Sequence, residues 1–219
     1  MNNNTTKTHK AWGLDYLLFD FMKVTAALPG LLWFRPRWIY ENDAAKKRIR
    51  GGALLVSNHD GFFDPLYLQF AVWYRRHHFI CSKEFFEGRA AWMFRAFHCI
   101  PIDRENFQMS SFRGILDHLR AGELVTIFPE GHVNDGSGEI AAFKSGMVLM
   151  AMQSRTPIIP VYLKPRAHWY SRLVFAIGEE VDPNTLFADR PAMQRIDAIA
   201  SMLHEREEQL KHLVEEKTL

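Results

Sequence analysis

From residue 50 onward, short apolar segments alternate with segments of helical periodicity, and this alternation constrains the fold most strongly. The apolar segments are almost continuously hydrophobic, as expected of strands buried on both faces of a sheet. Strands alternating with helices indicate an α/β fold with a mostly parallel sheet flanked by helices. The predicted strands are Ala53–Ser57, His78–Ser82, Cys99–Asp103, Leu124–Phe128, Pro157–Leu163 and Leu173–Ile177, and the predicted helices are 65–75, 84–97, 110–121, 143–155 and 191–216.

The composition is that of an ordinary soluble fold. At 219 residues the chain is long enough to bury a sizeable core in one domain. Hydrophobic residues make up 47% and charged residues 24%, and a net charge of +2 gives no reason to expect a nucleic-acid partner. We divide the chain into residues 1–50, with a polar start, interfacial helices and a basic linker, and an α/β domain over residues 51–219.

The N-terminal segment at residues 12–34 is apolar and long enough to span a bilayer. However, Asp15, Asp20 and Lys23 interrupt it, and such residues near the bilayer centre cost roughly 2.5–3.5 kcal/mol each. Pro29-Gly30 breaks its helical pattern. We therefore expect two short helices, hinged at Pro29-Gly30, that lie in the membrane interface. A helix packed on the protein's own core is the alternative.

Six basic residues follow this segment, and they suit an anionic membrane surface at about 1 kcal/mol per residue close to it. A solvated basic linker is the alternative. With the membrane reading, we expect a peripheral or monotopic protein on the cytoplasmic face of the cell membrane. The six residues are Arg35, Arg37, Lys46, Lys47, Arg48 and Arg50.

The two cysteines, Cys81 and Cys99, lie in predicted apolar strands. We expect buried thiols in a reducing compartment, because two cysteines do not make a disulfide framework. Together with His77, His78 and His98 they suggest a metal site. That interpretation is not favoured, because there is no CxxC or HExxH spacing and alternate residues of a strand point to opposite faces.

The junction VSNHDGFFDP carries a histidine and an aspartate five residues apart, His59 and Asp64. A second pair with this spacing, His98 and Asp103, falls on a predicted strand, where five residues span about 16–17 Å and odd spacing puts the side chains on opposite faces. His59 and Asp64 instead lie between a strand end and a helix start. Gly61 permits a turn there, so the two side chains can come within hydrogen-bonding reach.

This turn predicts a specific pairing. Asp64 is expected to cap the helix before Pro65, a residue favoured in a first helical turn. Its carboxylate would fix the tautomer of His59 and stabilise its protonated form. The other imidazole nitrogen would then be available as a general base.

A second strand ends in Phe-Pro-Glu-Gly, where Glu130 is the only charge and Gly131 lets the backbone approach a ligand closely. Lys144, near a predicted helix start, could attract an anion. The alternative is a bare turn with a surface glutamate. At the end of another strand, Arg104 could grip a phosphate, or could simply pair with an adjacent acidic residue. Two prolines in Pro157–Val161 indicate an edge or irregular strand.

Four short motifs follow one another in a fixed order: NHxxxxD at 58–64, IPIDR at 100–104, FPEG at 128–131 and PIIPV at 157–161. Their order and spacing resemble the glycerolipid acyltransferases of the 1-acyl-sn-glycerol-3-phosphate (lysophosphatidic acid) acyltransferase type. The resemblance covers Leu54 to Leu163, about half of the chain. Residues 12–34 also resemble the membrane-dipping helix pair of bacterial members.

The resemblance implies transfer of an acyl chain from acyl-CoA or acyl-carrier protein to the hydroxyl of a lysophospholipid, without a cofactor or metal. Within it, His59 deprotonates the acceptor hydroxyl and Asp64 orients His59. Backbone N–H groups near 59–61 or 130–132 would stabilise the oxyanion. The substrate-binding residues implied are Asn58, Arg104, Glu130, Gly131, His132 and Lys144.

The sequence departs from the family after FPEG, where His132-Val133-Asn134 stands in place of Thr-Arg-Ser. The missing arginine normally helps to hold a phosphate, and its loss removes roughly 1.5–3 kcal/mol of hydrogen bonding unless another group replaces it. Lys144 or His132 could do so. The acceptor is therefore 1-acylglycerol-3-phosphate, another lysolipid or a non-glycerol acceptor.

Two functions of other classes stay open from the sequence. One is a metal-dependent hydrolase that would use His59, Asp60, Asp64, Glu130 and His132. The other is a non-catalytic lipid-binding protein, which would have no need of the His59–Asp64 pair. The amphipathic C-terminal helix at 191–216 is expected to cover the sheet, and the sequence assigns it no function.

Overall fold

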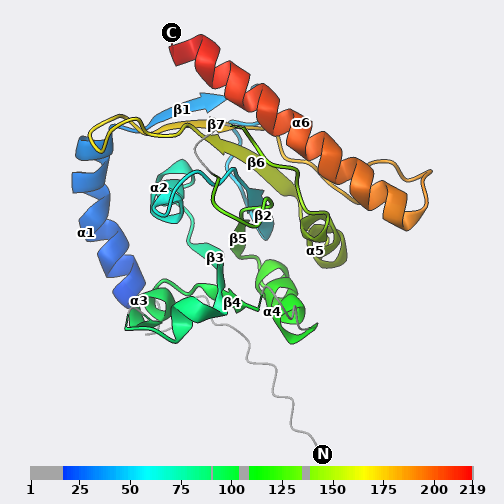
Figure 1. Ribbon diagram of the computed structural model, residues 1–219, viewed down its shortest axis with the longest axis horizontal. Coiled ribbons are helices and arrows are strands. Elements are labelled where there is room, and N and C mark those ends of the chain that lie inside the picture. The colour runs from blue at the N-terminus through cyan, green and yellow to red at the C-terminus, as the bar shows by residue number, and fades with distance from the viewer. Residues whose placement is uncertain (1–16, 90, 104–108, 135–138, 219) are drawn as a thin grey trace, which may run out of the picture.

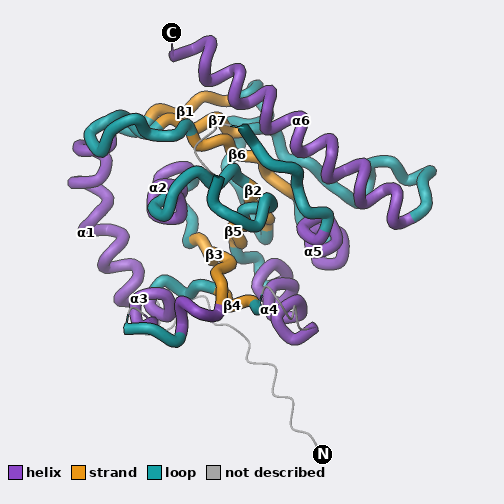
Figure 2. Tube along the Cα trace, in the orientation of Figure 1, coloured by secondary structure: helices purple, strands orange, loops and turns teal. Residues whose placement is uncertain are grey.

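The computed structural model describes residues 17–89, 91–103, 109–134 and 139–218, and they form one sheet with helices on both faces (Figures 1 and 2). The strand order across this seven-stranded sheet is β1-β7-β6-β2-β5-β3-β4. The strands are Arg37–Tyr40 (β1), Ala53–Val56 (β2), His77–Ser82 (β3), Ile100–Ile102 (β4), Leu124–Ile127 (β5), Ile158–Leu163 (β6) and Val174–Ile177 (β7).

Neighbouring strands of the sheet are parallel at every pairing except one. β2 lies between β5 and β6 and is parallel to both, whereas β6 and β7 are antiparallel. This arrangement confirms the predicted α/β fold with a mostly parallel sheet. All six predicted strands are present.

Two apolar layers cover the sheet, and β2 shows how its sequence serves both. Leu54 and Val56 face a core built with α4, α5 and α6, while Ala53 and Leu55 face a core built with α2 and the end of α1. This alternation explains why the strand reads as continuously apolar. The helices are Leu17–Phe34 (α1), Asp64–Ala71 (α2), Ala91–Ala96 (α3), Met109–Arg120 (α4), Gly146–Ser154 (α5) and Ala192–Thr218 (α6).

Strand β1 was not predicted, and it belongs to the sheet. It pairs in parallel with β7 and buries Ile39, although basic residues surround it in the sequence. The sheet therefore extends past the predicted boundary at residue 50. At the other edge, β4 is shorter than predicted, so that His98 and Asp103 flank the strand instead of lying on it.

Two prolines in Pro157–Val161 predicted an edge or irregular strand, and the edge position is wrong. β6 lies in the interior of the sheet, and all six of its residues are buried. Pro160 lacks an N–H donor, but its carbonyl accepts a hydrogen bond from Gly178 N at 2.9 Å. Gly178 also leaves room for the proline ring, since a Cβ there would lie 2.7 Å from Pro160 Cγ. The glycine that follows the neighbouring strand β7 thus makes a central proline possible.

The predicted hinge at Pro29-Gly30 is also wrong, because α1 runs through both residues as one helix. Gly30 serves close packing instead: a Cβ there would lie 2.4 Å from the ring of Phe70 on α2. The inner side of α1 is tied down by ionic contacts. Asp20 accepts a hydrogen bond from Arg76 Nε at 2.8 Å, and Lys23 donates to the carbonyl of Arg75.

The predicted helix at 84–97 is divided into a 3-10 turn at Lys83–Phe86 and the short helix α3. The remaining predicted helices correspond to α2, α4, α5 and α6 with small shifts at their ends. None of the helices in the described part of the chain is long and apolar enough to cross a membrane.

Candidate active site

The polar motifs gather where the parallel strands β2, β5 and β6 end side by side. Asn58 follows β2, and its side-chain amide forms two hydrogen bonds with the backbone of Leu163 at the end of β6, at 2.8 and 2.9 Å. Asn58 is buried. These contacts fasten the loop that carries His59 to a neighbouring strand, and the predicted substrate-binding role of Asn58 stays a prediction.

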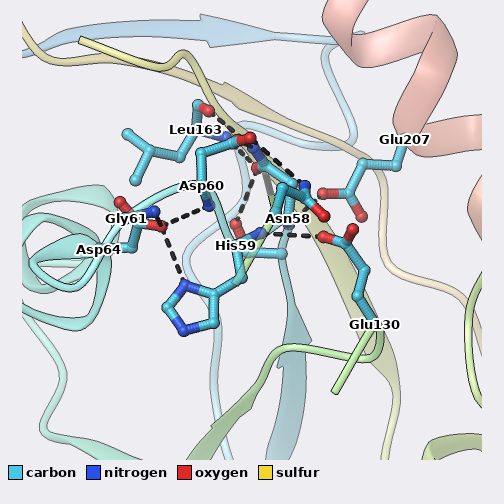
Figure 3. Close-up of polar contacts among 10 residues, drawn as sticks. Asn58, His59, Asp60, Gly61, Asp64, Glu130, Leu163 and Glu207 are labelled. Atoms are coloured by element: carbon cyan, nitrogen blue, oxygen red, sulfur yellow. Dashed lines mark hydrogen bonds and ion pairs between the residues drawn. The ribbon is translucent and has the colours of Figure 1, made fainter. Parts of the chain in front are cut away.

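His59 and Asp64 form the pair predicted from the sequence (Figure 3). His59 Nδ1 lies 3.0 Å from Asp64 Oδ2, and both side chains are largely buried. The same oxygen accepts hydrogen bonds from the backbone N–H groups of Asp60 at 2.8 Å and Gly61 at 2.7 Å. The tight turn between strand and helix thus wraps its own amides around one carboxylate.

The expected helix cap is not formed. Phe63 is the residue that precedes α2, and no side chain caps the helix there. Asp64 lies inside the first turn, and its carboxylate points back to the loop instead. The residue is thus committed to His59 and the turn.

These contacts fix the chemistry of the imidazole. The carboxylate oxygen is an acceptor, so Nδ1 of His59 has to donate, and the neutral ring then carries a lone pair on Nε2. Among the described residues, Nε2 has no hydrogen-bond partner. The arrangement leaves a base of defined orientation, with its Nδ1–H directed at the Asp64 carboxylate.

Glu130 is buried, and both of its carboxylate oxygens accept backbone hydrogen bonds. Oε1 accepts from His59 N at 2.9 Å, and Oε2 accepts from Ala141 N at 2.8 Å. It was predicted to bind substrate, but these contacts instead join the loop after β2 to the loop after β5.

Glu207 on α6 is a site residue that sequence reasoning missed. Its Oε1 accepts the hydrogen bond of Asn58 N, and its side chain reaches the catalytic loop from the helix (Figure 3). Burial, with the nearby Glu130 and Asp60 carboxylates, raises the pKa of Glu207 well above its ordinary value. The signal was present in the sequence, because Glu207 interrupts an apolar helical stripe formed by Leu203, Leu210 and Val214.

A cavity of about 570 Å³ opens beside His59. The ring of Phe128, the first residue of FPEG, stacks on the imidazole with centroids 4.0 Å apart and planes inclined by 17°. The contact adds a second constraint on ring orientation that the motif alone did not reveal. The other lining residues are Ile80, Ile102, Met109, Phe112, Ile127, Pro129, Gly131, Lys144, Gly146, Met147, Leu149, Met150 and Gln153.

Lys144 is the one charged residue among those lining residues besides the titratable His59. Its backbone N–H donates to Pro129 O at 3.0 Å, which brings it beside FPEG. Gly131 has a φ of 78°, and a Cβ there would lie 2.4 Å from Lys144 Nζ. Glycine is therefore needed both for the backbone conformation and for the approach of the ammonium group.

The remaining predicted residues are placed less directly. His132 is exposed, its Nδ1 lies 3.1 Å from Glu130 O, and it does not line the cavity. Arg104 lies outside the described residues, two positions beyond Ile102 of the cavity wall. All six residues of the basic cluster after α1 are exposed.

The backbone amides named for the oxyanion are largely engaged already. Those of Asp60 and Gly61 donate to Asp64, that of His59 donates to Glu130, and that of Gly131 donates to Phe128 O at 3.1 Å. Of the predicted group, the amides of Glu130 and His132 donate to no acceptor among the described residues, and these two stay the candidates.

Comparison with known proteins places these motifs in a family. The sequence profile described as "Acyltransferase" matches residues 38–164. The 1-acyl-sn-glycerol-3-phosphate acyltransferase of Bacillus subtilis (strain 168) is 27% identical over 171 residues, which are 75% of this chain and 84% of that protein. The enzyme of the same name from Streptococcus pneumoniae (strain ATCC BAA-255 / R6) is 29% identical over 164 residues, 73% of this chain but 58% of that longer relative.

A solved structure shares the fold. The crystal structure of the 1-acyl-sn-glycerophosphate (LPA) acyltransferase from Thermotoga maritima superimposes with a TM-score of 0.62. The match covers 90% of this chain and 80% of the other, at 21% sequence identity.

Proposed function

This chain belongs to the acyltransferase family, and from that premise we propose that it transfers a fatty acyl group from a thioester donor to a lysophospholipid hydroxyl in phospholipid synthesis. The donor is acyl-CoA or acyl-carrier protein, and the acceptor is 1-acylglycerol-3-phosphate. The observation that carries the proposal is the His59–Asp64 contact of 3.0 Å at the mouth of an apolar cavity.

In the proposed reaction, Nε2 of His59 takes the proton of the acceptor hydroxyl as its oxygen attacks the thioester carbonyl. The tetrahedral intermediate then collapses, the carbon–sulfur bond breaks, and the imidazolium returns a proton to the leaving thiolate. Asp64 holds Nδ1–H throughout and stabilises the imidazolium. The products are the ester and a free thiol, and the histidine ends neutral as it began.

The cavity fits the two parts of such a substrate. Its walls between the sheet and helices α4 and α5 are almost entirely apolar, which suits an acyl chain. Lys144 supplies a cation beside the FPEG turn, and we propose that its ammonium takes over phosphate binding from the arginine that is absent at position 133. Arg104, predicted for the same phosphate, stays part of the proposal.

We also propose that the protein works at a membrane surface. One side of α1 presents large apolar side chains to solvent, and Trp169 stacks on its Trp33 with centroids 5.1 Å apart. Such a stripe on one side of a helix that is ionically anchored on the other suits burial in a lipid interface. Its exposed residues are Leu17, Phe21, Val24, Leu28, Leu32 and Trp33.

The test is an acyl-transfer assay with acyl-CoA or acyl-carrier protein as donor and 1-acylglycerol-3-phosphate as acceptor. Free thiol is measured together with the lipid product by mass spectrometry. His59→Ala is expected to lower kcat by at least about 100-fold, as loss of a general base does, and Asp64→Asn to lower it substantially because the tautomer is no longer fixed.

A matched control is His212→Ala, because that exposed histidine lies on α6 outside the cavity. It should retain activity within a few fold. Equal thiol release by wild type and His59→Ala would reject the mechanism. Activity of the wild type on uncharged lysolipids alone would reject the proposed acceptor while leaving the transfer reaction in place.

A further inference from the structure

A second polar cluster lies at the opposite ends of the strands from His59. His78 is near the start of β3, Glu123 directly precedes β5, and His118 is in the last turn of α4. Glu130 follows the carboxyl end of β5 and contacts the loop of His59, so the length of that strand separates the two sites. One ligand-type atom from each of the three side chains lies within 4.8 Å of the others.

The end of α4 holds two of these residues in register. Glu123 N donates to His118 O at 3.1 Å and Gly122 N donates to Leu119 O at 3.1 Å, with Gly122 at a φ of 85°. This pair of bonds is the Schellman ending of a helix, and it returns the chain toward the last turn. As a result, Glu123 Oε2 lies 2.5 Å from His118 Nδ1. The contact follows from the turn and does not depend on flexible surface side chains.

The third residue brings an unusual contact. His78 Nδ1 lies 3.2 Å from His98 O, and a carbonyl can only accept, so Nδ1 carries the proton. Its Nε2 lies 3.4 Å from Glu123 Oε2, the same oxygen that lies beside His118 Nδ1. Three ligand-type atoms from three separate elements therefore converge on one point, as the ligands of a single ion do.

We propose that His78 Nε2, His118 Nδ1 and Glu123 Oε2 bind a divalent transition-metal ion, Zn²⁺ by the chemistry of the ligands. Two imidazoles and one carboxylate, with water in a fourth position, suit Zn²⁺. Tetrahedral coordination at about 2.0–2.1 Å places ligand atoms roughly 3.3 Å apart, close to the 3.4 Å between His78 and Glu123. His118 and Glu123 separate slightly, and the His118 ring then carries its proton on Nε2.

The surroundings already have the form that metal-bound histidines require. The His98 carbonyl on Nδ1 of His78 fixes both the tautomer and the ring orientation, which is the usual supporting contact of a metal-bound imidazole. His78 belongs to the metal-binding set considered from the sequence, but its partners come from α4 and the turn after it, which no local spacing in that set could reveal. The ion would tie α4 to β3 and β5, a structural role apart from acyl transfer.

The experiment uses the full chain without an affinity tag. Zn²⁺ is titrated by calorimetry, and Co²⁺ serves as a spectroscopic probe of tetrahedral coordination. Wild type is expected to bind one ion per chain and to gain roughly 5–10 °C in unfolding temperature at a Zn²⁺ concentration well above Kd. His118→Ala and Glu123→Gln are expected to lose at least about 100-fold in affinity, together with the visible Co²⁺ bands.

The matched control is His212→Ala, which removes an exposed histidine–glutamate pair on α6, His212 with Glu215 at 3.2 Å. It should bind as wild type does. Far-ultraviolet circular dichroism and acyl transfer without metal establish that each variant is folded. The proposal is overturned if wild type fails to bind Zn²⁺ or if His118→Ala binds it as tightly as wild type. It is also overturned if His212→Ala abolishes binding, because the ion would then lie at His212.

Discussion

At the scale of single residues, three carboxylates support His59, and they do so in two different ways. Asp64 contacts the imidazole itself, whereas Glu130 and Glu207 reach the loop that carries it only through backbone N–H groups. Glu130 and Glu207 therefore act indirectly, by holding the loop of His59 in place. Their removal should disturb kcat through misplacement of His59, where a displacement of about 1 Å can cost on the order of 100-fold in rate.

Glu207 permits a sharp test of such positioning. Glu207→Leu leaves the N–H of Asn58 without its acceptor, and we expect kcat to fall roughly 10- to 100-fold with little change in KM. Glu207→Gln keeps an acceptor oxygen of the same reach and should stay within a few fold of wild type. Steady-state kinetics of the two variants measure the difference. Equal losses would show that the contact with Asn58 does not matter.

The raised pKa of Glu207 adds a pH readout. The folded protein keeps a proton that the unfolded chain releases above its ordinary pKa of 4.5, so wild type loses stability as pH rises from 4.5 through the folded pKa. Glu207→Gln has no such proton to release. Its stability relative to wild type should therefore increase with pH in urea unfolding. A constant difference between pH 4.5 and 8 would contradict the assignment.

Lys144 can be tested through the acceptor it is proposed to hold. Loss of a charge-assisted hydrogen bond of about 1.5–3 kcal/mol corresponds to a rise of roughly 10- to 150-fold in KM for 1-acylglycerol-3-phosphate on Lys144→Ala. The KM for the donor and for an uncharged lysolipid should change little. Lys46→Ala, on an exposed surface pair with Asp43, is the control. A uniform loss for all acceptors would mean that Lys144 supports the turn and not the phosphate.

The sequence predicted those residues whose signal is local. His59 and Asp64 could be paired from the sequence because they are only five residues apart, at the end of a strand, with a glycine between them that permits a turn. Glu130 and Asn58 were found as motif residues, but their contacts with Ala141 and Leu163 could not be predicted, because these partners depend on how the strands are ordered. Glu207 lies 149 positions from Asn58, which it contacts. A single glutamate in an apolar stripe indicates a buried polar contact but does not identify the residue on the other side of it.

At the scale of elements, α1 combines an anchored side and an apolar side. Asp20 and Lys23 bind the loop after α2, so the acidic and basic residues that disfavour a membrane span are used to fasten the helix to the domain. The predicted hinge failed for a related reason. Phe34 packs on Tyr67 and Phe70, and Gly30 lets the helix approach Phe70, so packing holds the helix straight through Pro29.

We expect the apolar side of α1 to govern membrane binding. Replacing Phe21 and Leu28, which are 65% and 66% exposed, by lysine removes apolar surface that a bilayer would bury, at roughly 1.5–3 kcal/mol for each side chain fully buried. Binding to vesicles containing anionic lipid should fall at least about tenfold in a co-sedimentation assay. Met193→Lys, at the exposed start of α6 on the other side of the molecule, is the control (Figure 1). If the α1 variant binds vesicles as wild type does, the membrane contact lies on another part of the protein.

At the scale of the whole molecule, strand content was predictable and strand order was not. Each strand buried on both faces carries its own apolar signal, but no local pattern states that β7 runs antiparallel to β6 or that β1 joins beyond it. Pro157 and Pro160 predicted an edge or irregular strand, because Gly178, which accommodates Pro160, follows a different strand and is remote in the sequence. Long-range complementarity of this kind decides where the sheet changes direction.

That complementarity gives the last prediction. Gly178→Ala places a Cβ 2.7 Å from Pro160 Cγ, so the junction of β6 and β7 has to shift, and we expect a loss of about 1–3 kcal/mol in unfolding free energy. Gly88→Ala, with no atom within 4 Å of the added Cβ, should change stability by less than about 0.5 kcal/mol. Pro160→Ala removes the opposing atom, so the double variant should recover part of the loss in a double-mutant cycle measured by denaturant unfolding. Strict additivity of the two substitutions would show that the proline and the glycine are not coupled, and the central position of β6 would need another explanation.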